Sequence, residues 1–255
     1  MILAIDVGNT HIVLGCIDNG DILNIVRIRT DPHETTTEYA IKLKDIMELY
    51  EIDTNALEGA IISSVVPPVT QLLTEAVKMI TGQDCMVVGP GMKTGLNIRI
   101  DDPGTLAPDI LVGSVAAMEY YGVPAIIMDL GTATTIVAVD GNRCYRGGAI
   151  LPGVKLSYEA LAAGTSLLPD ISIVPPEKVI GTNTVDAMRS GAVFSTAASL
   201  DGMIERMEEE LGAPCAVVAT GGLSNAIAPY CRRKITCDDD LLLKGLWILY
   251  RKNKK

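Results

Sequence analysis

Two stretches of the chain, residues 1–20 and 125–142, repeat one order of residue types, and this repeat constrains the fold more than any other feature. Each stretch begins with an apolar run that ends at an aspartate, Asp6 or Asp129. A short turn of glycine and small polar residues follows, then a second apolar run and a Gly/Asn/Asp turn typical of β-hairpins. Because the copies lie about half the chain apart, we expect two related lobes that face each other.

Each of these turns has the chemistry of a phosphate-binding site. Glycine lets the backbone approach a bulky anion, and main-chain N–H groups together with Thr or Asn side chains donate hydrogen bonds to phosphate oxygens. An aspartate at the end of a strand can hold a cation, directly or through water. One copy alone fits an ordinary β-turn equally well, since turns favour the same residues. Two copies in matching contexts favour a nucleotide clamp.

The composition favours a globular α/β protein and excludes several partners. With 255 residues, 48% of them hydrophobic but only one Trp and one Phe, the chain must build its core from aliphatic side chains, which suits buried strands. The formal net charge of −10 argues against nucleic acid and against an anionic membrane surface as main partners. No apolar run approaches a membrane span and no secretory signal pattern is present, so we expect a cytoplasmic protein. Six cysteines without a C-x-x-C pair, and only two histidines, predict no zinc cluster.

The order of strand and helix patterns in the first half is that of an α/β lobe. After the first hairpin we expect a strand over 21–30, a helix over 39–50 opened by threonine caps, a strand over 57–66, a helix over 69–82 and a strand over 84–88. The loop Gly89–Gly95, which contains Lys93, is either plain connection or the wall of a site. A helix over 105–122 then carries Asp109 in its first turn, where a carboxylate either complements the helix dipole or serves chemistry.

The second half continues the alternation of strands and helices. We expect, in chain order, a glycine-rich stretch over 145–153, a helix over 155–161, a loop over 167–180, a long helix over 185–211 and a terminal helix over 241–250. Residues 215–225 have the pattern of a strand, a glycine turn and the start of a helix. Gly221 and Gly222 in that turn form a natural cradle for a nucleoside or a phosphate.

Five motifs in this chain resemble, in their order, those of the type III pantothenate kinase family: Asp6-Val7-Gly8-Asn9-Thr10, Gly89-Pro90-Gly91-x-Lys93-Thr94-Gly95, Asp129-x-Gly131-Thr132-Ala133-Thr134-Thr135, Gly148-Ala149-Ile150-x-Pro152-Gly153 and Asn183-Thr184. The Asp-x-Gly-x-Thr element alone would indicate only the wider superfamily of acetate kinase, sugar kinases, Hsp70 and actin. The resemblance implies an α/β fold of two tandem actin-like (ribonuclease H-like) lobes, each a mixed sheet flanked by helices. We place these lobes at residues 1–115 and 116–255.

The resemblance also implies an activity, which is the ATP-dependent phosphorylation of pantothenate to 4′-phosphopantothenate, the first step of coenzyme A biosynthesis. It implies a homodimer that uses Mg²⁺ and a monovalent cation, K⁺ or NH₄⁺. The positions that match the family's phosphate-binding loop are Asp6, Val7, Gly8, Asn9, Thr10, His11, Ile12 and Val13. The positions that match its pantothenate site are Ala107, Pro108, Asp109, Ile110 and Thr184. Asp109 matches the general base, Thr132 a nucleotide contact and Asp129 the ligand of the monovalent cation, while Asp6 suits Mg²⁺ held through water.

One departure from the family pattern concerns the acceptor. The family usually has Gly-Ala-Asp-Arg around the catalytic aspartate, whereas this chain has Ala107-Pro108-Asp109-Ile110. An arginine offers a planar fork of donors to a carboxylate and isoleucine offers none. Two alternatives therefore stay open beside pantothenate kinase: a kinase for a related small molecule, and a nucleotide-binding regulator of the same fold without turnover. The three aspartates favour a kinase, and a Rossmann dehydrogenase is disfavoured because no G-x-G-x-x-G follows a strand.

Overall fold

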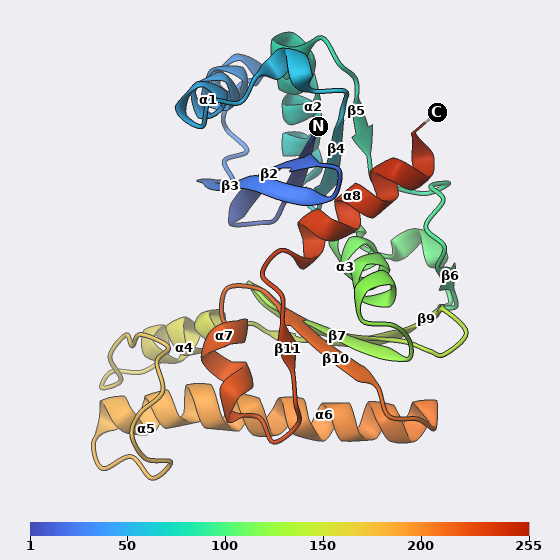
Figure 1. Cartoon of the computed structure of the whole chain (residues 1–255). Coiled ribbons are helices and arrows are strands. Elements are labelled where there is room, and N and C mark those ends of the chain that lie inside the picture. Colours follow the sequence, from blue (N-terminus) through green and yellow to red (C-terminus); the bar gives the residue numbers. More distant parts are fainter. Residues whose placement is uncertain (255) are drawn as a thin grey trace. The chain divides into compact units, whose positions relative to one another are not determined.

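The computed structural model describes residues 1–254, which divide into two compact units (Figure 1). The first unit comprises Met1–Gly95, Asp102–Ala116 and the C-terminal segment from Leu241; the second comprises Leu96–Asp101 and Ala117–Asp240. This division departs from the expected lobes 1–115 and 116–255 chiefly at the C-terminus. The reason is that helix α8 (Leu241–Asn253) packs against strands β1 and β4 of the first unit.

A five-stranded mixed sheet forms the centre of the first unit, in the order β3-β2-β1-β4-β5. Its strands are β1 (Ile2–Val7), β2 (His11–Asp18), β3 (Asp21–Arg29), β4 (Ala60–Ser64) and β5 (Cys85–Val87). β1 to β3 are antiparallel, whereas β4 runs parallel to β1 and β5 parallel to β4. The β2–β3 hairpin turns at Asn19 and Gly20, whose φ angles of 50° and 99° are those that a tight hairpin turn needs.

Helices cover both faces of this sheet. The helices of the first unit besides α8 are α1 (Thr36–Leu49) and α2 (Pro67–Thr81), with short 3₁₀ turns at Thr54–Ala56 and Pro103–Thr105. α1 and α2 lie side by side and share one core cluster with the alternate residues Leu3, Ile5 and Val7 of β1 (Figure 1). α8 covers the opposite face, where Leu243 packs on Gly15 so closely that a Cβ at Gly15 would lie 2.7 Å from it. Helix α3 (Pro108–Tyr120) runs from the first unit into the second.

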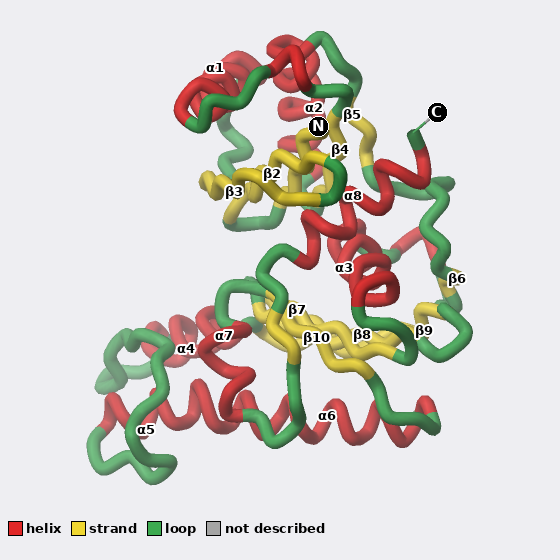
Figure 2. Tube along the Cα trace, viewed as in Figure 1, coloured by secondary structure: helices red, strands yellow, loops and turns green. Residues whose placement is uncertain are grey.

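The second unit repeats this topology. Its sheet has the order β11-β10-β7-β8-β9-β6, so that, apart from β6, each strand has a counterpart in the first sheet (Figure 2). The strands are β6 (Asn97–Ile98), β7 (Ala125–Leu130), β8 (Ala133–Val139), β9 (Cys144–Pro152), β10 (Ala216–Thr220) and β11 (Thr236–Cys237). The predicted α/β fold of two related mixed sheets flanked by helices is therefore confirmed.

The helices of the second unit are α4 (Val154–Ala163), α5 (Thr184–Ser190), α6 (Thr196–Leu211) and α7 (Ser224–Ile227), with a π-helical turn at Gly191–Ser195 and a 3₁₀ turn at Ala228–Tyr230. α4, α6 and α7 share one core cluster with the sheet, whereas α5 leads into the π-turn. α6 runs along the sheet (Figure 1), and its buried residues Leu200 and Ile204 join Ile126 and Met128 of β7 in one core cluster. The long helix expected over 185–211 is thus one helical stretch interrupted by a π-turn.

The glycine-rich stretch over 145–153 forms most of strand β9 and leads into α4 through Gly153. Gly148 lies in β9 opposite Val137, and a Cβ there would come 2.1 Å from the Ile136 carbonyl oxygen. The glycine is needed because the neighbouring strand passes too close for a side chain. Within residues 1–254, no helix is long and apolar enough to cross a membrane.

Candidate active site

The two strand-end aspartates occupy corresponding positions in the two sheets. Asp6 of β1 pairs in register with Ser63 of β4, and Asp129 of β7 pairs with Thr220 of β10. The residues on either side of each aspartate point into a core cluster, so both carboxylates point to the opposite face of their sheet. Each aspartate is half-buried and each neighbouring hydroxyl residue is buried.

The first turn, Gly8–His11, connects the paired residues Val7 and Ile12. The Gly8 N–H donates to the His11 carbonyl oxygen at 2.9 Å, and Asn9, Thr10 and His11 are exposed. Of the eight residues expected to bind phosphate, Val7 and Ile12 bury their side chains in the core. The exposed side chains available to a ligand are therefore those of Asn9, Thr10 and His11, beside the half-buried Asp6 and Val13.

Thr30, directly after β3, holds this turn at two points. Its hydroxyl donates to the Gly8 carbonyl oxygen at 2.7 Å. Its backbone N–H donates to the Thr10 carbonyl oxygen at 3.0 Å. A hydroxyl residue at the end of a strand was the only local signal of this role, and such residues are common.

The second turn is one residue shorter, with Gly131, Thr132 and Ala133 between the paired residues Leu130 and Thr134. The Gly131 N–H donates to the Ala133 carbonyl oxygen at 3.1 Å. The N–H of Gly153, directly after β9, donates to the Thr132 carbonyl oxygen at 3.2 Å. Thr132 is exposed, as a nucleotide contact requires.

The Asp129 carboxylate lies between two glycines. A Cβ on Gly221, whose φ is 92°, would lie 2.3 Å from Asp129 Oδ1, and a Cβ on Gly131 would lie 3.2 Å from the same atom. Gly222, by contrast, has no atom within 4 Å of its would-be Cβ. Gly221 therefore leaves the room that the Asp129 carboxylate occupies, whereas the nucleoside or phosphate cradle expected at Gly221 and Gly222 stays a prediction.

The donor set suits a cation that brings other oxygen ligands with it. Among residues 1–254, no group of three or more His, Cys, Asp or Glu side chains is placed to hold a metal ion. One carboxylate with nearby backbone carbonyls fits a cation that is also bound by water and phosphate. Asp129 and Asp6 can each supply such a carboxylate.

Asp109 lies in the first turn of α3, directly after Pro108. Burial raises the pKa of its carboxyl above the usual range, against the backbone N–H groups of Ile110 and of Asp109 itself, which lower it. The Ile110 N–H donates to Asp109 Oδ1 at 2.7 Å. A half-buried carboxylate with a raised pKa is a stronger proton acceptor than an exposed one. Ala107, Pro108 and Ile110 around it are half-buried and carry no polar side chain.

The loop Gly89–Gly95 is fixed by the end of α8. The Lys93 N–H donates to Asn253 Oδ1 at 2.8 Å, and Asn253 Nδ2 donates to the Lys93 carbonyl oxygen at 3.0 Å. Lys252 Nζ donates to the Thr94 carbonyl oxygen at 3.2 Å. These contacts join residues far apart in sequence, so no local pattern could predict them.

Thr184, the remaining expected substrate residue, is the first residue of α5 and is exposed. The preceding Asn183 caps this helix by accepting the Asp186 N–H at 2.9 Å. Thr184 is therefore open to a ligand, and its contact with substrate stays a prediction.

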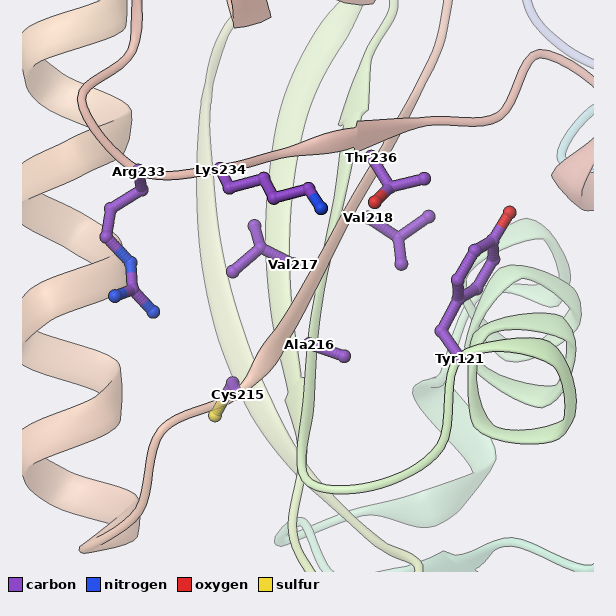
Figure 3. A pocket seen from close by; sticks show the side chains of 8 residues that line it. All are labelled: Tyr121, Cys215, Ala216, Val217, Val218, Arg233, Lys234 and Thr236. Atoms are coloured by element: carbon purple, nitrogen blue, oxygen red, sulfur yellow. The ribbon is translucent and has the colours of Figure 1, made fainter.

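A separate pocket of about 310 Å³ lies in the second unit (Figure 3). It is lined by Tyr121, Cys215, Ala216, Val217, Val218, Arg233, Lys234 and Thr236. These residues include the amino-terminal part of β10, whereas ligands of open α/β sheets bind at the carboxyl ends of strands. Arg233 is paired with Glu208, and the Tyr121 hydroxyl donates to Asp238 at 2.7 Å. Since its polar groups are largely compensated and no expected site residue lines it, this pocket is not the candidate site.

Comparison with known proteins gives the family. The sequence model of type III pantothenate kinase matches residues 2–206. The chain belongs to the type III pantothenate kinase family. A type III pantothenate kinase of Exiguobacterium sibiricum is 44% identical to it over 254 residues, which cover 100% of both chains.

Solved structures place this family member in a wider fold class. Component A of the (R)-2-hydroxyglutaryl-CoA dehydratase of Acidaminococcus fermentans matches with a TM-score of 0.60 at 14% identity, covering 100% of this chain and 99% of that one. The ROK hexokinase of Thermus thermophilus matches with a TM-score of 0.53 at 14% identity, covering 99% of both chains. At this identity the likeness shows the fold alone, an α/β fold with two mixed sheets flanked by helices.

Proposed function

We propose that this chain transfers the γ-phosphoryl group of ATP to the hydroxyl of pantothenate and so catalyses the first step of coenzyme A biosynthesis. The observation that carries the proposal is the family match together with the two aspartate-ended turns of the site. Phosphoryl transfer needs positioned reactants, cations that spread charge, and a proton acceptor. The chain supplies candidates for each.

In the proposed reaction, the acceptor hydroxyl oxygen forms a bond to the γ-phosphorus while the bond from that phosphorus to the β,γ-bridging oxygen breaks. The bond's electron pair leaves with ADP. Asp109 takes the proton of the attacking hydroxyl, and its raised pKa suits that role. The backbone N–H groups and exposed side chains of Gly8–His11 bind the phosphates, and Thr132 and the Gly221–Gly222 turn contact the nucleotide.

Two cations are part of this proposal. Asp6 would hold Mg²⁺ through water, and Asp129 would hold K⁺ or NH₄⁺ in the cradle that Gly131 and Gly221 form around its carboxylate. Bound cations neutralise charge that develops on the phosphate oxygens. The chain's own contribution is to keep each carboxylate at a fixed strand end.

The phosphoryl acceptor has two candidates, pantothenate and a related small alcohol. Ile110 leaves this turn of α3 without a guanidinium, so Ala107, Pro108 and Ile110 offer a carboxylate only backbone groups. A related small alcohol without a carboxylate is therefore a second candidate. Measuring ADP release with pantothenate and with near analogues that lack the carboxylate distinguishes the two. Faster release with an analogue than with pantothenate would replace the acceptor while leaving the kinase in place.

The proposal includes a homodimer and a cytoplasmic location. Apolar side chains are exposed on β9, on α4 and on the loop after α4, among them Ile150 at 76%, Leu167 at 90% and Ile180 at 82%. Exposed large apolar side chains on successive segments of one part of the chain suit burial against a partner. All six cysteines are free thiols, which suits a reducing compartment.

A further inference from the structure

We propose that Thr30 is a positioning residue that fixes the shape of the phosphate-binding turn Gly8–His11, so that its side chain controls nucleotide affinity without touching the acceptor. The inference rests on the proposed function of this turn. It adds a residue that lies outside the sequence motifs of the site.

The geometry makes Thr30 the link between the turn and the rest of its sheet. The β2–β3 ladder ends with His11 paired to Arg29, so Thr30 comes next to the turn at the open end of the hairpin. Its N–H then extends the ladder to Thr10 at 3.0 Å, and its hydroxyl reaches across to Gly8 at 2.7 Å. Thr30 is 9% exposed, so these bonds are shielded from water.

The Thr30 hydroxyl affects the backbone of the turn because its hydrogen bond goes to a backbone carbonyl oxygen, that of Gly8. A peptide unit is planar, so fixing the direction of the Gly8 carbonyl also fixes the direction of the N–H of the next residue, Asn9. Glycine has little conformational preference of its own, so without this bond the direction of the peptide after Gly8 is less restricted. An N–H group that is already oriented loses less entropy when a phosphate oxygen binds.

The second unit shows that this link is built into the repeat. Gly153 follows β9 as Thr30 follows β3, and its N–H donates to the Thr132 carbonyl oxygen at 3.2 Å. There is no room for a side chain at that position, since a Cβ would lie 2.2 Å from the same oxygen. The turn of the first unit is one residue longer, and there the Thr30 hydroxyl makes an additional bond, to the Gly8 carbonyl oxygen.

The test compares Thr30→Val with Thr30→Ser and with a matched control. Valine has the shape of threonine and keeps the backbone N–H, so only the bond to Gly8 is lost. The control is Thr81→Val, because the Thr81 hydroxyl also donates to a carbonyl oxygen, that of Val77, at 2.7 Å. Thr81 ends α2, which begins just after β4 and runs the length of the sheet, so it lies at the end remote from the turn.

Affinity for the magnesium complex of a non-hydrolysable ATP analogue is measured by calorimetry, and steady-state constants are measured for ATP and pantothenate. We expect Thr30→Val to raise the Kd roughly three- to tenfold, the range of one shielded hydrogen bond. The KM for ATP should rise with it, while the KM for pantothenate stays the same. Thr30→Ser should restore most of the affinity, and Thr81→Val should lower thermal stability with the Kd unchanged.

An unchanged Kd in Thr30→Val, or an equal rise in Thr81→Val, would overturn the inference. So would a failure of serine to restore affinity. Because nucleotide binding needs no acceptor, an error about pantothenate leaves this test intact. A wild-type chain that binds no nucleotide would instead overturn the proposed function, and the inference with it.

Discussion

Asp109 is a half-buried aspartate with a raised pKa in the first turn of helix α3. We expect Asp109→Asn to lower kcat by about two to four orders of magnitude while nucleotide affinity changes little, because the amide keeps the shape and cannot accept the proton. Steady-state kinetics together with analogue binding measure both quantities. Near-normal turnover of the variant would remove Asp109 from the mechanism.

The raised pKa of Asp109 gives this prediction a second readout. As a base, the carboxyl must be ionised, so the acid limb of kcat/KM should lie at higher pH than the ordinary aspartate pKa. The same raised pKa affects stability in the opposite direction. Folding favours the protonated carboxyl, so Asp109 contributes to the free energy of unfolding at low pH, and this contribution is lost as pH rises through the folded pKa. Asp109→Asn should therefore be at least as stable as wild type to urea at neutral pH, whereas a misfolded variant would be less stable.

Gly221 and Gly212 form a matched pair for testing the Asp129 site, because both have a positive φ, 92° and 70°. A Cβ on Gly221 would lie 2.3 Å from Asp129 Oδ1 and 2.7 Å from the Leu130 backbone, whereas a Cβ on Gly212 would meet no atom within 4 Å. We expect Gly221→Ala to displace the Asp129 carboxylate and to weaken the response of activity to K⁺ more than the response to Mg²⁺, and Gly212→Ala to leave both responses unchanged. Each salt is titrated at constant ionic strength, because screening would otherwise mimic a specific effect. Full activity of the wild type in Na⁺ alone would contradict a monovalent site.

Ile110 tests the acceptor at the level of one side chain. If the rest of the pocket accepts pantothenate, Ile110→Arg should lower its KM by tenfold or more, since a charged hydrogen bond contributes ~1.5–3 kcal/mol. Ile110→Lys is the control, because lysine adds the charge without the planar fork. An unchanged or higher KM in the arginine variant would indicate a pocket shaped for another acceptor.

At the scale of elements, the end of α8 is the support of the Gly89–Gly95 loop. Asn253→Ala removes both side-chain bonds to Lys93, so we expect faster hydrogen exchange of the loop amides from Lys93 to Gly95. Lys254→Ala is the control, because Lys254 pairs with Glu58 and makes no bond to the loop. Equal exchange in the two variants would show that the loop is held by other contacts.

Local patterns predicted most helices and strands, but they did not predict the register in which neighbouring strands pair. The cap of α1 was predictable, because Thr35 and Glu38 form a capping box, and so was the hairpin at Asn19 and Gly20. The register in which β2 and β3 pair beyond that hairpin turn was not predictable. The turn pairs Asp18 with Asp21, but a shift between Cys16 and Ile17 adds a residue to β3 and changes which residue comes opposite the phosphate-binding turn.

This bulge explains why Thr30 was missed. Without the shift, Arg29 rather than Thr30 would come next to Thr10, and every later side chain of β3 would face the other side of the sheet. A similar shift between Ala138 and Val139 occurs in the second unit, so the bulge is itself part of the repeat. Bulges carry no distinct signal in a single sequence.

At the scale of the whole molecule, the repeat of strand, turn and strand predicted the architecture because each copy could only continue as the same sheet. The strand order β3-β2-β1-β4-β5 recurs as β9-β8-β7-β10-β11. The return of α8 to the first unit was beyond prediction, because it depends on packing against β1 and β4 rather than on any pattern within residues 241–253. Contacts between residues far apart in sequence therefore decide both the placement of α8 in the first unit and the support of the Gly89–Gly95 loop.

The most direct test of the proposed function is identification of the product. The purified chain is incubated with MgATP, K⁺ and pantothenate, and the mixture is analysed by ³¹P nuclear magnetic resonance and mass spectrometry, with Asp109→Asn alongside. We predict 4′-phosphopantothenate as a phosphate monoester, one ADP for each molecule formed, and almost none from the variant. Nucleotide binding without ADP release that depends on pantothenate would contradict the proposal and favour another acceptor or a regulator without turnover.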